Sequence, residues 1–398
     1  MAVATLSIFL VPMTADLGLS RGLFSSAVSL GGICAVAVSP VVGWWIDRRG
    51  AGTMVAAGGA LVGFCAIGLA FVTQSWAFLL LYLVGRMSFA SPLELGTSTA
   101  VSNWFIRRRP AALGLLNGSQ GTGLALMPFV AHLIIVAWDW RVAWMSLGLY
   151  TLVVAVLPAL LLMRRRPEDM GLEPDLYSPQ EGGPSGGAAP GPAVEYGFTL
   201  GQAVLTRAFW LMAVFSAAGY MVQAGVSLHQ ASHYLNQGMS GFSAAVTVSV
   251  FAFSQVPGGL CWSALARRVP LRYLLALTGF TVAAGAVGAA ASSTLLEGGL
   301  AAAALGAGVG GLHVLLRLAW ADYYGRRHLG SIRGVALPVQ IGGQALGPVI
   351  AGFMFDATDS YWIAFVVFAS AVSVAALLVS SAAPPAAPAE PGPASGGG

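Results

Sequence analysis

Ionisable side chains at Arg86, Glu94, His313 and Arg317 lie within long apolar stretches, where a charge is costly unless it is paired or faces water. Arg86 can hold a carboxylate through two hydrogen bonds, or it can cap backbone carbonyls between helices. Glu94 and His313 can exchange a proton near neutral pH, although His313 also fits a packed histidine on an apolar helix. These residue types predict substrate binding by Arg86 and proton coupling by Glu94 or His313.

Asp47 ends another apolar stretch and is followed by Arg48 and Arg49. Its carboxylate can accept charge-assisted hydrogen bonds from these arginines or from the amino end of a neighbouring helix. The pattern predicts a gating latch, with Asp47 and Arg48 as its residues, that holds one conformation closed. The alternative is a solvated turn with ordinary charge balance.

Amide side chains inside the apolar stretches are further candidates for contact with a bound solute. The predicted substrate-binding residues besides Arg86 are Asn117, Gln120, Gln255 and Gln340. These amides can line a cavity, or they can bond one helix to another.

The composition of the chain indicates which secondary-structure elements position these residues. The 398-residue chain is 57% hydrophobic and 9% charged, with a mean hydropathy of +0.78, whereas soluble domains carry roughly 25% charged residues. A membrane-crossing helix needs about 20 apolar residues. Twelve apolar stretches approach or reach this length, and they run over 2–13, 23–44, 53–72, 76–101, 111–136, 142–163, 209–228, 243–264, 273–291, 298–319, 334–355 and 361–379. The chain is predicted to be an all-α membrane protein of twelve transmembrane helices.

The first stretch is short, because its residues before Asp16 span only about 20 Å of a core about 30 Å thick. We therefore expect helix 1 to be truncated and the true start to lie upstream of Met1.

All nineteen basic residues are arginines, and most of them lie in alternate loops on one side of the predicted helices. Arginine-rich short loops mark the cytoplasmic side, so both termini and the middle loop are predicted to be cytoplasmic in a multi-pass protein of the cell membrane. The middle segment, 164–207, shifts to Pro, Gly and acidic residues and is predicted to be a flexible linker. The tail, 382–398, is predicted to be disordered.

An internal repeat relates the two sides of this linker. A constant shift of 220 carries Gln120 onto Gln340, Pro128 onto Pro348 and Asp139 onto Asp359. The chain is therefore predicted to contain two pseudo-symmetric six-helix bundles, 1–163 and 208–381. Paired bundles suit alternating access around a site near the bilayer midplane.

The same shift places Glu94 and Arg317 within one turn of each other on corresponding helices, since it carries position 97 onto Arg317. We predict that they form a salt bridge between the halves that acts as an inner gate. The alternative is that each residue pairs locally, for example Arg317 with Asp322.

Other classes of function lack the residues they need. Without lysine there is no Walker A loop, which excludes ATP-driven transport by this chain. Cys34, Cys65 and Cys261 lie in apolar stretches without metal-ligand spacing, and no nucleophile or phosphate-binding constellation is present. No enzyme activity, metal, cofactor or nucleic-acid partner is predicted.

The run Gly43-Trp-Trp-Ile-Asp47-Arg48-Arg49-Gly50 resembles the GxxxDRxG loop of the major facilitator superfamily, and Arg86 occupies the place of that family's helix-4 arginine. Within the superfamily, the runs 103–114, 140–144 and 166–172 are similar to motifs of monocarboxylate transporters and of the related oxalate and formate exchangers. Stretch 243–264 carries neither Asp nor Arg, and stretch 334–355 carries no Lys. An oxalate-type site is therefore not predicted.

The resemblance implies a monomeric secondary transporter of a small solute, with an organic anion such as a monocarboxylate as the expected substrate and a proton or exchange gradient as the driving force. Two alternatives stay open. One is efflux of a hydrophobic, drug-like compound, and the other is a sensor with the transporter fold that carries no flux.

Overall fold

The structure is a computed structural model that describes residues 3–18, 21–172 and 197–386, and in these ranges the chain forms helices joined by turns. The helices of the N-terminal half are α1 (Val3–Leu17), α2 (Arg21–Arg49), α3 (Ala51–Leu69), α4 (Ser75–Ser88), α5 (Glu94–Trp104), α6 (Arg109–Ala137), α7 (Trp140–Thr151) and α8 (Leu157–Leu161). After the short α9 (Leu200–Val204), the helices of the C-terminal half are α10 (Arg207–Asn236), α11 (Gly241–Leu265), α12 (Leu271–Ala291), α13 (Leu295–Tyr324), α14 (Leu329–Thr358) and α15 (Trp362–Ser380).

Two crossings contain a turn of π-helix. Phe89–Leu93 joins α4 to α5, and Leu152–Val156 joins α7 to α8, so each pair forms one continuous span. Pro92, which has no backbone N–H to donate, lies in the first of these turns. Eleven spans in the described ranges are long and apolar enough to cross a membrane, and α1 is shorter, at 15 residues. This agrees with the predicted all-α membrane fold.

The internal repeat appears in the positions where the helices begin. The starts of α2, α3, α4 and α6 at residues 21, 51, 75 and 109 lie 220 residues before those of α11, α12, α13 and α14 at 241, 271, 295 and 329. The two predicted six-helix bundles are therefore recognisable in the structure. The bundles differ in one pair of corresponding spans. α13 runs through Leu295–Tyr324 without the π-turn that divides α4 from α5.

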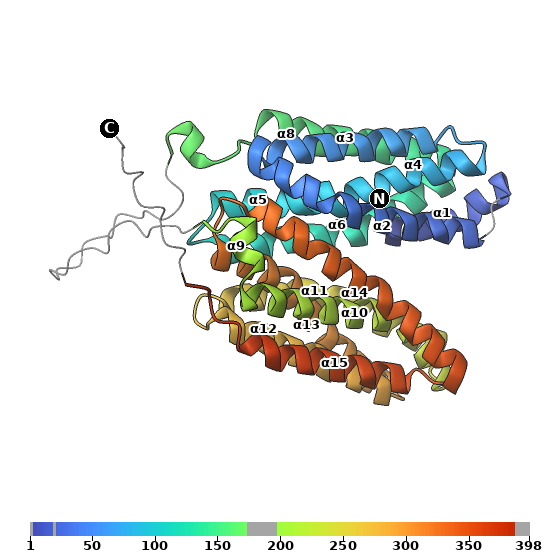
Figure 1. The fold of residues 1–398 in the computed structure, drawn as a ribbon. Helices are drawn as coiled ribbons and strands as arrows, with labels where there is room; N and C mark the ends of the chain where they lie inside the picture. Colours follow the sequence, from blue (N-terminus) through green and yellow to red (C-terminus); the bar gives the residue numbers. More distant parts are fainter. Residues whose placement is uncertain (1–2, 19–20, 173–196, 387–398) are drawn as a thin grey trace, which may run out of the picture.

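The two halves touch at one end of the molecule and diverge toward the other end (Figure 1). We call the touching end the linker end, because α8 and α9 lie there. Small residues allow close approach of backbones between helices: a Cβ on Gly43 of α2 would lie 2.1 Å from the carbonyl oxygen of Gly330 in α14, and one on Gly334 would lie 2.6 Å from that of Ser39. The structure therefore shows a conformation closed at the linker end.

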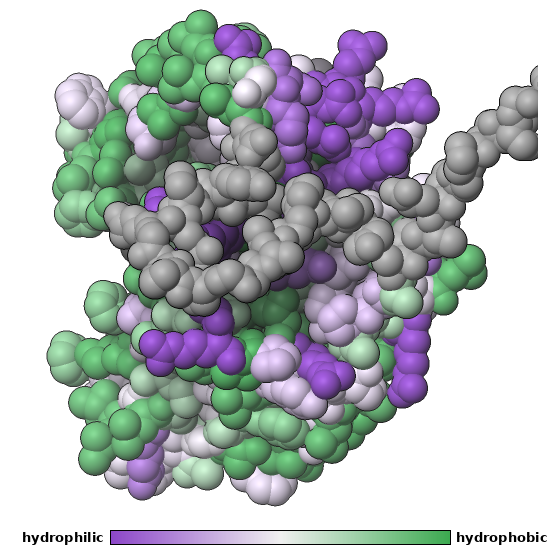
Figure 2. All heavy atoms as spheres, turned by 90° about the vertical axis from the view of Figure 1, so that its left-hand side faces the viewer, coloured by the Kyte–Doolittle hydropathy of each residue, from purple (hydrophilic) through white to green (hydrophobic). Residues whose placement is uncertain are grey.

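Figure 2 looks onto the linker end and shows hydrophilic side chains gathered on one side of the N-terminal half, whereas its other flank and much of the flanks of the C-terminal half are apolar. The exposed arginines of this half at the linker end are Arg48, Arg49, Arg107, Arg108, Arg164 and Arg165. The apolar flanks suit contact with lipid tails.

The predicted linker is structured at both of its ends. Pro167–Met170 forms a turn of 3-10 helix, and the amide of Phe198 donates to the carbonyl of Tyr324 at 3.1 Å. The expected flexibility of 173–196 and the expected disorder of 387–398 concern residues outside the described ranges.

The contact between Gly43 and Gly330 leads to a first prediction. Gly43→Ala places a methyl group against the backbone of Gly330, so the linker end cannot close in this way and the protein should shift toward conformations open there. Leu337, buried at 5% exposure among Val42, Ile46 and Leu95, can report this when changed to cysteine. We expect faster maleimide labelling of this cysteine and reduced transport.

The experiment uses a background in which Cys34, Cys65 and Cys261 are serine. Gly32→Ala in the same helix is the matched control, because a Cβ at Gly32 would meet no described atom within 4 Å. Equal labelling rates in the two alanine variants would show that the close approach of α2 and α14 does not limit opening.

Candidate functional site

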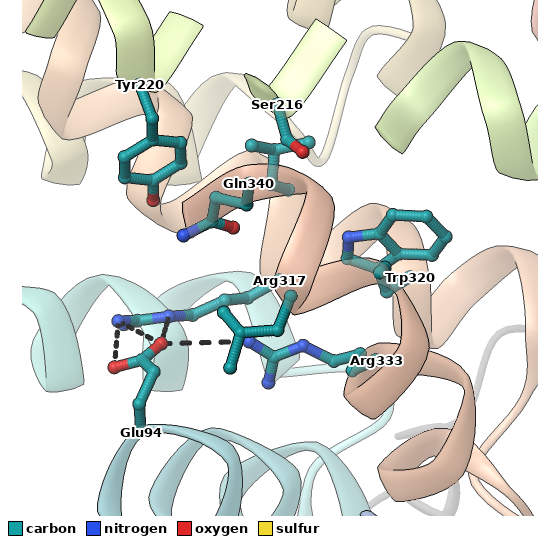
Figure 3. A pocket seen from close by; sticks show the side chains of 10 residues that line it. Glu94, Ser216, Tyr220, Arg317, Trp320, Arg333 and Gln340 are labelled. Atoms are coloured by element: carbon teal, nitrogen blue, oxygen red, sulfur yellow. Dashed lines mark hydrogen bonds and ion pairs between the residues drawn. The ribbon is translucent and has the colours of Figure 1, made fainter. Parts of the chain in front are cut away.

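Three charged residues from both halves meet near the middle of the bundle. Glu94 begins α5 directly after the π-turn, Arg317 lies in α13 and Arg333 lies in the second turn of α14. Figure 3 shows both guanidinium groups converging on the Glu94 carboxylate. We call these three residues the central charge cluster. Glu94 stands ten residues before the end of α5, about 15 Å from the linker end at helical rise.

Arg317 makes the closest contacts of the cluster. Its Nε and Nη2 donate to Glu94 Oε1 at 3.1 and 2.8 Å, and Nη2 also donates to Glu94 Oε2 at 3.0 Å and to Gln120 Oε1 at 2.9 Å. The structure thus brings together the pair predicted as a gate, and it adds Gln120. Asp322, the alternative partner of Arg317, forms an ion pair with Arg109 instead.

Arg333 approaches the same carboxylate from α14. Its Nη2 lies 3.7 Å from Glu94 Oε1, and its Nη1 donates to the hydroxyl of Ser98 in α5. Ser98 in turn donates to the carbonyl of Glu94 at 2.6 Å. Arg333 and Arg317 are each only 7% exposed. Two buried guanidinium cations therefore share one carboxylate, which leaves the cluster with an excess positive charge.

The cluster keeps an open donor group. Arg317 Nη1 is buried, and no acceptor among the described residues reaches it. A narrow pocket beside it is lined by Glu94, Ser216, Tyr220, Leu316, Arg317, Trp320, Arg333, Ala336, Leu337 and Gln340. Figure 3 shows Tyr220 and Gln340 reaching toward Arg317 from the side opposite Glu94. An unmet buried donor costs about 1–3 kcal/mol, so Arg317 Nη1 offers a hydrogen bond to any acceptor that enters the pocket.

His313 lies one turn before Arg317 on α13, and its ring centroid is 5.4 Å from that of Tyr220. It is therefore next to the central charge cluster, on the side of the pocket. Both predicted proton-coupling residues, Glu94 and His313, belong to one neighbourhood.

Arg86 lies in the same span as Glu94, eight residues nearer the divergent end. A π-turn adds one residue to the helical register, so this separation acts like seven residues of α-helix. Seven residues are about two turns, which puts both side chains on one face. The stem of Arg86 packs against Gly31, and its Nε is buried without an acceptor among the described residues. Its guanidinium lies 5.8 Å from the centroid of the Phe89 ring, and no described contact joins it to Glu94.

Two other predicted substrate contacts, Asn117 and Gln255, are not among the residues that line the pocket. Asn117 is buried where α6 meets α11, and a Cβ on Gly259 would lie 2.7 Å from its Nδ2. Gln255 packs its backbone against α13, with its carbonyl oxygen 2.1 Å from where a Cβ on Gly310 would be. Gln120 and Gln340, by contrast, contact or line the central charge cluster.

The predicted latch residue Asp47 binds the amino end of a helix in the other half. Its Oδ1 and Oδ2 accept hydrogen bonds from the backbone amides of Gly330 and Ser331, at 2.8 and 2.7 Å. An anion at a helix amino end is stabilised by the helix dipole. Arg48 does not take part in this contact, since its guanidinium stacks 4.3 Å above the Trp44 ring.

A second set of contacts joins the halves at the linker end. Arg109 forms its ion pair with Asp322 and also donates to the carbonyls of Phe105 and Ser102, at 2.9 and 3.1 Å. Arg326 donates to the carbonyl of Asn103 at 2.6 Å. Both arginines thereby satisfy carbonyls at the carboxyl end of α5, which would otherwise lack partners.

The segment after α8 joins this set. Arg326 forms an ion pair with Glu168 at 2.7 Å, and Arg166 donates to the carbonyl of Arg327 at 3.2 Å. Partial burial raises the pKa of the Glu168 carboxyl, but a backbone hydrogen bond and the Arg326 guanidinium outweigh it and hold this pKa below its usual value. Glu168 is thus ionised at neutral pH, and this contact weakens only when the pH falls through its lowered pKa.

Sequence reasoning missed Arg333, Arg109 and Arg326 as site residues, because it assigned them to loops. The predicted helix began at residue 334, whereas α14 begins at Leu329 and carries Arg333 inside the bundle. The internal repeat could have corrected the predicted start of this helix, because it aligns the start of α14 with that of α6. Within the described residues, no three His, Cys, Asp or Glu side chains gather as possible metal ligands.

Comparison with known proteins shows which family this chain resembles in sequence and in fold. The model of the Major Facilitator Superfamily matches residues 1–340. The mouse protein named Monocarboxylate transporter 11 is 30% identical over 347 residues, which cover 84% of this chain and 73% of that protein. The solved structure of FucP, a Major Facilitator Superfamily transporter in the outward conformation, superposes with a TM-score of 0.72 at 15% identity and covers 96% of this chain and 95% of FucP. The proton:xylose symporter XylE gives a TM-score of 0.70 at 10% identity, with 94% and 90% covered.

Proposed function

This chain belongs to the Major Facilitator Superfamily, resembling its monocarboxylate transporter branch, and we propose that it carries a small organic anion, a monocarboxylate, across the cell membrane by secondary active transport. It is a transporter with the twelve-helix fold and not an enzyme. The name of its mouse relative supports the monocarboxylate as substrate.

The observation that carries the proposal is the open edge of Arg317. Its Nη1 has no acceptor among the described residues, and it stands beside a second buried guanidinium, Arg333. A substrate carboxylate can accept hydrogen bonds from Nη1 and balance the excess charge, while the Tyr220 hydroxyl and the Gln340 amide bind its remaining oxygens. A charged pocket of this kind favours an anion over the hydrophobic compound of the efflux alternative.

The proposed cycle is alternating access between the bundles 1–163 and 208–381, with 164–207 as the linker that joins them in a monomer. The arginine-rich loops support a cytoplasmic position for the linker end, and in this orientation the conformation described here faces outward. To open inward, the protein must release the contacts of Asp47 with α14 and of Glu94 with Arg317 and Arg333. These residues are the proposed gates.

Proton coupling is assigned to Glu94, with His313 as its neighbour. A proton on Glu94 removes the negative charge that holds Arg317 and Arg333 across the interface between the halves. Proton arrival therefore favours opening of the linker end and also leaves more positive charge for the substrate. Arg86, on the same face and about two turns toward the divergent end, is proposed to attract the anion before it reaches Arg317.

The test is uptake by purified protein in liposomes. Labelled monocarboxylates are offered with an inward proton gradient, alongside a neutral sugar and an apolar cationic drug, and empty liposomes measure passive leak. We expect saturable monocarboxylate uptake that the gradient accelerates. Uptake of the sugar or the drug without uptake of any carboxylate would overturn the anion proposal, and no flux of any solute would favour the sensor alternative.

A further inference from the structure

The central charge cluster holds two fixed cations and one fixed anion within one buried site. Glu94 Oε1 accepts two hydrogen bonds from Arg317 and lies 3.7 Å from Arg333 Nη2. With His313 uncharged, the formal charges of these groups sum to +1. Arg86 lies about two turns away along its helix, beyond direct contact with the cluster.

A buried site with a net formal charge of +1 has a preferred ligand charge, because uncompensated charge is costly in a medium of low dielectric constant. One bound carboxylate brings the sum to zero. A dicarboxylate brings it to −1 and places a second carboxylate near that of Glu94, where like charges repel. An uncharged ligand leaves the +1 unbalanced.

We propose that Arg333 is a specificity-determining residue, and that Arg333 and Glu94 together count the charge of the substrate so that the site accepts a monoanion and rejects a dianion. Glu94 acts as a resident carboxylate that occupies the place of a second substrate carboxylate. Arg333 supplies the cation that allows the first one to bind. The inference rests on the proposed function and deepens it by assigning the residues that restrict the site to anions of a single charge.

The surroundings of Arg333 support this role. Arg333 is 7% exposed, and it donates to Ser98, whose own hydroxyl hydrogen is directed to the Glu94 carbonyl. This arrangement fixes the guanidinium beside Glu94 and leaves Arg317 Nη1 without an acceptor among the described residues.

The experiment compares butyrate with succinate, which share a four-carbon chain and differ by one carboxylate. Affinities are measured by titration calorimetry on purified protein at neutral pH, where both acids are ionised. Using the ratio of the two affinities cancels changes in conformational equilibrium, because both ligands bind the same conformation. Wild type should prefer butyrate by about tenfold or more, the factor that corresponds to 1.4 kcal/mol.

Two single variants should move this ratio for different reasons. Glu94→Gln raises the sum to +2, so we expect the preference to shift toward succinate by about tenfold or more. Arg333→Gln lowers the sum to zero, so both anions should lose affinity, whereas Arg333→Lys keeps the charge and should keep the butyrate preference. Asp356→Asn and Arg268→Gln, which change exposed charges, are matched controls.

The double variant Glu94→Gln with Arg333→Gln is decisive, because it returns the sum to +1 through Arg317 alone. It should recover the butyrate affinity that Arg333→Gln loses, which a purely structural role for Arg333 does not predict. If the ratio stays at the wild-type value in Glu94→Gln, or if the double variant does not recover butyrate binding, the charge-counting role is overturned while monocarboxylate transport stands. If wild type binds neither acid, the proposed function falls, and this inference falls with it.

Discussion

Replacing Arg317 with glutamine is expected to lower the initial rate of monocarboxylate uptake by about a hundredfold or more. The change removes Nη1, the open donor of the pocket, together with three hydrogen bonds to Glu94. Glu94 would keep only Arg333, whose nearest nitrogen lies 3.7 Å away. Removing one partner of a buried ion pair typically costs about 3–5 kcal/mol, and the lower end of this range applies here because the Glu94 side chain is 26% exposed. Each 1.4 kcal/mol is about a tenfold change in an equilibrium constant.

Uptake is measured in proteoliposomes beside Arg268→Gln, which removes an exposed arginine of the same half. Size-exclusion profiles and melting temperatures of both variants show whether Arg317→Gln still folds. Breaking the ion pair should cost far more than a twofold change in rate. Uptake by Arg317→Gln within about twofold of wild type would therefore show that Arg317 neither binds substrate nor acts as a gate.

Exchanging the two charges separates these roles. Glu94→Arg combined with Arg317→Glu restores an ion pair between α5 and α13, so opening and closing of the linker end should recover in the cysteine-labelling assay. A failure of the exchange to restore any function lost in the single variants would count against the gate.

The sequence predicted the scaffold and one inter-half contact. Long apolar stretches and the 220-residue shift sufficed for the helices, and the same shift placed Glu94 within one turn of the position that corresponds to Arg317. The shift worked because the span formed by α4 and α5 and the span formed by α13 begin 220 residues apart, so corresponding positions in them lie at similar depths.

What sequence could not supply depends on how helices begin and pack. Arg333 was assigned to a loop because the predicted helix began after this arginine, at residue 334, whereas α14 begins at Leu329 and its first residues are buried. From the sequence, Asp47 could bind either the neighbouring arginines or the amino end of another helix. Which of these partners it binds depends on which helix packs across α2. Arg48 stacks on Trp44 four residues earlier, a local contact that competes with the predicted latch.

Asp47→Asn is expected to shift the protein toward conformations open at the linker end by about tenfold or more. The carboxylate of Asp47 accepts from two backbone amides, those of Gly330 and Ser331, at the start of α14. Asparagine keeps the shape but has one acceptor oxygen, so its NH2 group would face one of these amides. A hydrogen bond to a charged group contributes about 1.5–3 kcal/mol, and loss of the favourable helix-dipole interaction adds to this.

The cysteine reporter at Leu337 should therefore label faster, and uptake should fall, while membrane insertion and the stability of each half stay unchanged. Asp139→Asn is the matched control, because Asp139 accepts from the amide of Val142 at 2.7 Å at the start of its own helix, α7. Asp139 makes the same kind of bond without joining the halves. Equal labelling and uptake in the two variants would refute the latch.

The repeat explains why this single latch should matter so much. The counterpart of Asp47 is Arg267, and the counterpart of Gly330 is Pro110, which has no backbone N–H to donate. The amino end of α6 therefore cannot be held from α11 in the way that α14 is held from α2. Arg109 and Asp322 join the halves there instead.

The Asp47 contacts and the Arg109–Asp322 ion pair use different residues on different helices. Asp47→Asn combined with Arg109→Gln should therefore open the linker end further than either change alone, with near-additive free energies. A double variant that labels no faster than Asp47→Asn would show that the latch alone sets the closed state.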